Sequence, residues 1–143
     1  MTALIAFDHA TAPAPRDPRA DLAGWERAAL DWFRTIAIRA RAEPRMPDPL
    51  NCALVGDTPE AQARAFLRMM PAALGRRVTL HRPAAESLSF DEAWLLGLLR
   101  AAARGEEHNL VFALASRLDR AFMRPARFLA EGLARHLAVI HTP

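Results

Sequence analysis

Lysine and tyrosine are absent from this sequence of 143 residues, and cysteine occurs once, as Cys52. One cysteine rules out an intramolecular disulfide and argues against a zinc site built from several thiolates. The lack of tyrosine removes phenolic acid–base chemistry. Apolar runs stay well short of the roughly 18 residues that a membrane helix needs, and the N-terminus does not resemble a signal peptide. We therefore expect a reduced, cytoplasmic protein with no metal site, no cofactor and no membrane partner.

Because lysine is missing, all 19 basic residues are arginine, although the net charge at pH 7 is only +3. Together with the many alanines, this bias is typical of a protein from a GC-rich bacterium. The functional alternative is selection for bidentate contacts with anions, which arginine makes better than lysine.

The length and composition indicate one folded domain covering residues 1–143. The chain is long enough to bury a core, and its 52% hydrophobic and 24% charged residues are typical of a folded protein. Two proline-rich stretches interrupt it. Residues 9–20 are expected to be an extended loop, and residues 43–49 a linker.

Helical periodicity predicts helices over residues 21–42, 58–74, 89–105 and 125–140. In each of them apolar side chains recur on one face. Leu98, in the middle of the third helix, is expected to lie at the centre of the core.

Local signals mark the ends of two of these helices. Thr58 is an N-cap residue, Pro59 suits the first helical position, and Gly75 suits the C-terminal end. Pro71 is expected to end or kink the same helix. The sequence SFDE at residues 89–92 is a capping box, with serine followed three residues later by glutamate.

Short apolar runs bounded by turn residues predict strands near residues 3–7, 50–55 and 77–82. Residues 110–115 are a further candidate strand. The stretch 110–123 also carries a helical face without a breaker, and helix is slightly favoured there.

The order of these elements, strand alternating with helix, predicts an α/β fold. We expect a small parallel sheet of three or four strands, covered by four or five helices. The alternative is a mostly α-helical domain.

Ligands of such sheets bind at the carboxyl ends of the strands. Six polar residues lie at the carboxyl ends of the three main strands and are candidates for a small anionic-ligand site: Asp8, His9, Asp57, Thr58, His81 and Arg82. Turn and cap formation explains the same residue types without a ligand.

Catalytic motifs are missing. The sequence has no phosphate loop, G-x-G-x-x-G, H-E-x-x-H, C-x-x-C or G-x-S-x-G pattern, so we identify no catalytic residue.

Two arginine-rich blocks are the candidates for nucleic-acid binding. Their residues are Arg64, Arg68, Arg76, Arg77, Arg117, Arg120, Arg124 and Arg127. Aromatic residues do not alternate with these arginines, as they do on surfaces that stack bases.

The leading hypothesis is a non-catalytic protein-interaction or regulatory module. Three tryptophans in a small chain exceed what its interior needs, and surplus large side chains often mark interfaces. Trp25, Trp32 and Trp94 are the interface candidates, and the partner is another protein or a second copy of the chain.

Overall fold

A computed structural model describes residues 22, 24–42, 56 and 58–141, and all regular structure in this part of the chain is helical. The elements in chain order are α1 (Gly24–Ala42), α2 (Pro59–Leu74), α3 (Phe90–Ala103), α4 (Glu107–Ala115), the short 3-10 helix η5 (Arg120–Phe122) and α5 (Met123–His141).

The predicted α/β fold with a parallel sheet is wrong for this part of the chain. Residues 77–82 form no strand, and residues 110–115 belong to α4. The other predicted strands, residues 3–7 and 50–55, lie outside the described residues. The alternative prediction, a mostly α-helical domain, fits the observed structure.

Val78 and Leu80 alternate with polar residues, but residues 77–82 have no regular secondary structure, and no strand lies beside them within the described part of the chain. The backbone N–H groups of Thr79 and His81 donate instead to the side-chain carboxylates of Asp91 and Glu92. A period of two in the sequence indicates an extended chain without showing what accepts its N–H groups.

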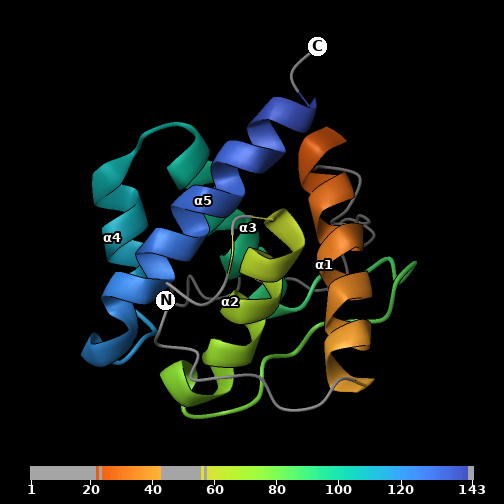
Figure 1. The fold of residues 1–143 in the computed structure, drawn as a ribbon, viewed down its shortest axis with the longest axis horizontal. Helices are drawn as coiled ribbons and strands as arrows, with labels where there is room; N and C mark the ends of the chain where they lie inside the picture. The colour runs from red at the N-terminus through yellow and green to blue at the C-terminus, as the bar shows by residue number, and fades with distance from the viewer. Residues whose placement is uncertain (1–21, 23, 43–55, 57, 142–143) are drawn as a thin grey trace, which may run out of the picture.

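The helices surround one core, with α5 packed against α1, α2, α3 and α4. Figure 1 shows α1 and α2 running side by side in the same direction, α4 on the opposite side of the molecule, and α5 crossing between them. Leu98 is fully buried, as predicted, within a cluster that includes Phe33, Phe66, Leu99 and Leu133.

The predicted helix ends are confirmed at α2 and α3. The Thr58 hydroxyl accepts a hydrogen bond from the Ala61 N–H at 3.1 Å, and Gly75 closes α2 with a left-handed φ of 74°. Both halves of the capping box at Ser89 are formed. Pro71 does not end its helix, because α2 continues to Leu74.

Candidate protein-interaction surface

The N-terminus of α3 exposes an aromatic ring and buries two acids. Phe90, the first helical residue, has 75% of its surface exposed, whereas Asp91 and Glu92 are almost completely buried. Buried carboxylates are rare unless they are paired, so their partners explain this arrangement.

Glu92 is paired with Arg34 of α1, which is 58 residues away in the chain and also fully buried. The Arg34 Nε–H donates to Glu92 at 2.7 Å and its Nη2 at 3.0 Å, while the backbone N–H groups of Ser89 and His81 complete the shell. Burial alone raises the pKa of Glu92, but the hydrogen bonds from Arg34 and Ser89 outweigh it and hold the pKa below its ordinary value.

Arg34 also binds the loop between α2 and α3. Its Nη1 donates to the Ala85 carbonyl at 2.8 Å and its Nη2 to the Ser87 carbonyl at 2.9 Å. Arg34 and the two α3 carboxylates therefore hold residues 76–89, which we call the pinned segment, against the helices.

Asp91 anchors the start of the pinned segment. It accepts hydrogen bonds from both terminal nitrogens of Arg76, from the backbone N–H of Thr79 at 2.7 Å, and from one terminal nitrogen of Arg117. The hydrogen bond from Arg76 is the main reason why the pKa of Asp91 lies well below its ordinary value.

Arg117 joins this polar cluster to the exposed aromatic ring. Its guanidinium lies 4.8 Å from the ring centroid of Phe90 and 4.9 Å from that of Trp94, while Asp91 holds it by hydrogen bond. Such cation–π contacts favour arginine over an aromatic face. The Trp94 indole N–H donates to the Ala113 carbonyl of α4 at 2.9 Å, which ties the stack to the neighbouring helix.

A second exposed ring lies on the same stretch of α4. Phe112 directly precedes Ala113 and has 76% of its surface exposed. We call Phe90, Trp94 and Arg117 the aromatic surface. The sequence analysis did not select either phenylalanine, although both positions indicate exposure. Phe90 directly follows a helix N-cap, and Phe112 does not lie on the apolar face of α4 that contains Leu110.

Of the predicted tryptophans, only Trp94 belongs to this surface. Trp25 and Trp32 of α1 are partly buried and pack against the core, where Trp32 meets Phe33 edge to face at 5.1 Å. Their role at an interface stays a prediction.

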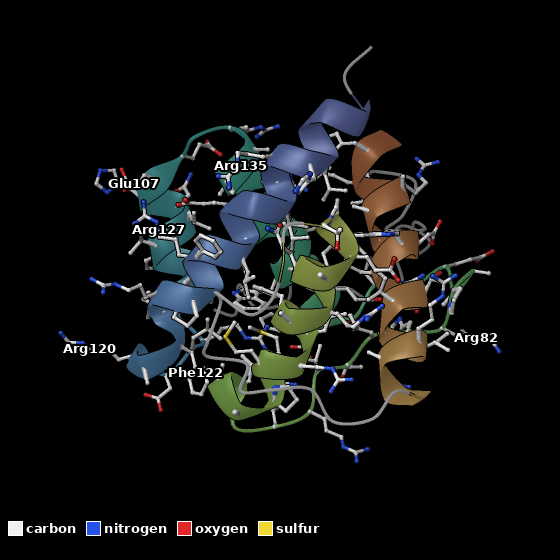
Figure 2. The ribbon with its side chains drawn as sticks, in the orientation of Figure 1. Arg82, Glu107, Arg120, Phe122, Arg127 and Arg135 are labelled. Carbon is white, nitrogen blue, oxygen red and sulfur yellow. The ribbon has the colours of Figure 1, made fainter. Side chains whose placement is uncertain are left out.

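The structure separates the described anionic-ligand candidates. Thr58 caps the N-terminal end of α2. The other described candidates belong to the pinned segment, which begins beyond the C-terminal end of this 16-residue helix, and the helix is about 24 Å long. His81 donates from Nδ1 to the Ser87 carbonyl at 2.8 Å. Arg82 is exposed and projects from the right edge of Figure 2. Asp8, His9 and Asp57 lie outside the described residues.

Several of the candidate nucleic-acid arginines pair with acids among the described residues. Arg64 binds Glu60, Arg76 and Arg117 bind Asp91, and Arg127 binds Glu107 and Glu131.

Of the other four, Arg68 donates to the Ala40 carbonyl, and Arg77, Arg120 and Arg124 are exposed. In Figure 2, Arg120 and the anionic-ligand candidate Arg82 lie at opposite edges of the molecule. Nucleic-acid binding by these residues stays a prediction.

The described residues contain neither a metal-binding cluster nor a membrane-spanning helix. In that part of the chain no His, Cys, Asp and Glu side chains gather in groups of three or more that could hold a metal ion. No helix there has the length and apolar character needed to cross a membrane.

Acid should remove the stability that Asp91 contributes. Because its pKa is lower in the folded than in the unfolded protein, this contribution is complete above about pH 4, the ordinary value, and declines as the pH falls below it. We expect wild type to be more stable than Asp91→Asn at pH 7, and the difference to shrink from pH 4 downward. Urea melts of both proteins between pH 7 and pH 2.5 measure it; a constant difference would contradict the expectation.

Comparison of the chain with protein-family models, curated proteins and solved structures gives no match.

Proposed function

We propose that this protein is a non-catalytic protein-interaction module that binds a partner protein, or a second copy of itself, through the aromatic surface and the exposed Phe112 of α4. The observation that supports the proposal is the exposure of Phe90 and Phe112, each about three quarters open to solvent. Large exposed apolar side chains on a small domain are typical of interfaces.

The surroundings of Phe90 favour binding because they are already ordered. Arg117 is held by Asp91 and packed against two rings, so little of its conformational freedom remains to be lost when a partner binds. Aromatic residues and arginine are also the side chains that contribute most at interface centres. Burying each exposed phenylalanine would stabilise a complex by roughly 1.5 to 3 kcal/mol.

We expect the double variant Phe90→Ser/Phe112→Ser to weaken association at least tenfold without unfolding the protein, since both side chains face solvent. Self-association is measured by sedimentation equilibrium over a wide concentration range, and partner binding by quantitative co-purification from the source cell.

Ile38→Ser is the matched control, because Ile38 is an exposed apolar residue on α1, away from the aromatic surface in the chain. It should associate like wild type. Equal losses in the control and the double variant would contradict a specific role of the aromatic surface. The same role would also be contradicted if the wild-type protein stayed monomeric and co-purified with the same proteins as the double variant.

A further inference from the structure

A groove lies between the C-terminal parts of α1 and α2 and the beginning of the pinned segment. Its volume is about 490 Å³. The apolar part of its lining includes Ala40 from α1, Leu67 from α2, and Val78 and Leu80 from the pinned segment. The carboxylates of Asp91 and Glu92 hold the third wall in place, through the backbone hydrogen bonds described above.

Three arginines also line this groove, one from each wall: Arg41, Arg68 and Arg77. We call the site the arginine groove. Its described lining residues include no carboxylate. The nearby C-terminal ends of α1 and α2 each carry about half a negative charge, and Arg68 reaches one of them at the Ala40 carbonyl, 3.5 Å away. Among the described lining residues, the full positive charges of Arg41 and Arg77 exceed the two partial negative charges of the helix ends.

We propose that the arginine groove binds a small organic anion, a carboxylate or a phosphate ester with a short apolar body. Guanidinium groups hold both kinds of head group by charge-assisted, often bidentate hydrogen bonds. The apolar lining gives the body of the ligand a surface on which to be buried.

The size of the groove favours a small molecule over a protein. Small-molecule sites typically measure about 300 to 1,000 Å³, a range that includes this groove. A stable protein interface needs roughly 800 Å² from each partner, far more than the few side chains here provide. The proposal is independent of the protein-interaction function, because the two sites share no residue.

The first experiment uses four probes on the full-length protein at low salt, by isothermal titration calorimetry: octanoate, octyl phosphate, inorganic phosphate and 1-octanol. We expect octanoate, octyl phosphate or both to bind at least tenfold more tightly than inorganic phosphate and octanol. Preference for one of the two amphiphiles identifies the head group. Equal binding of all four probes, binding of inorganic phosphate alone, or no binding would overturn the proposal.

The second experiment locates the site. Arg41→Gln/Arg77→Gln should weaken binding of the better probe at least tenfold by removing two cations. Ala40→Phe should weaken it similarly by filling the groove while keeping every charge. The control is Arg120→Gln/Arg124→Gln, which removes two exposed arginines from η5 and α5 and should bind like wild type.

Thermal melts verify that each variant is folded. Because Ala40→Phe and the arginine pair alter the groove in different ways, one of them remains informative if the other unfolds. Binding that falls equally in the control, or that survives both groove variants, would show that the arginine groove is not the site.

Discussion

Glu92→Ala is expected to destabilise the protein by about 3 to 5 kcal/mol, because it leaves the buried guanidinium of Arg34 without its counter-ion. The change also removes the acceptor of the Ser89 and His81 backbone N–H groups. Buried donors without a partner are costly in themselves. The free energy of unfolding is measured from urea melts at pH 7.

Glu60→Ala is the matched control for this measurement. Glu60 also pairs with arginines, Arg64 and Arg39, but at a solvent-exposed site where removal should cost at most about 1 kcal/mol. Similar losses for both variants would contradict the importance of burial. Hydrogen exchange gives a local readout, since the His81 amide should lose protection in Glu92→Ala and keep it in the control.

Leu98→Ala is expected to cost about 2 to 5 kcal/mol, the range for a fully buried leucine that leaves a cavity. Leu98 belongs to the buried core cluster, so the cavity would form among packed apolar side chains. Urea melts again provide the measurement.

Ile38→Ala removes an aliphatic side chain that is half exposed, and should change the midpoint far less. An unchanged midpoint for Leu98→Ala would contradict the core position of Leu98, because relaxation around the site removes only the cavity cost and not the lost burial. A drop for Ile38→Ala as large as that for Leu98→Ala would mean that burial is not what distinguishes the two positions.

The pinned segment connects the two proposed sites. Its Arg76 pairs with Asp91, which also holds Arg117 in the aromatic surface, while the next residue, Arg77, lines the arginine groove. The carboxylates that stabilise the fold thus also set the geometry of both surfaces.

Features that depend on near neighbours in the chain could be predicted from the sequence. The caps at Thr58 and Ser89 form as expected because their hydrogen bonds close within three residues. The burial of Leu98 followed from the apolar face of a single helix. These signals need no knowledge of what packs against the helix.

Features that depend on distant partners required the tertiary structure. Periodicity predicted a strand at residues 77–82, which is wrong, and only the approach of α3 shows that carboxylates accept the N–H groups of Thr79 and His81. The pairing of Arg34 with Glu92 spans 58 residues, so no local pattern reveals it.

The arrangement of both proposed sites was decided in the same way. Phe90 and Arg117 meet because α3 and α4 pack together, and the three arginines of the groove come from three separate segments. The sequence by itself determined the helices and their caps, because short-range hydrogen bonds and periodic apolar faces encode them. The tertiary structure alone decided which charges are buried in pairs and which side chains share a surface, because those depend on contacts between residues far apart in the chain.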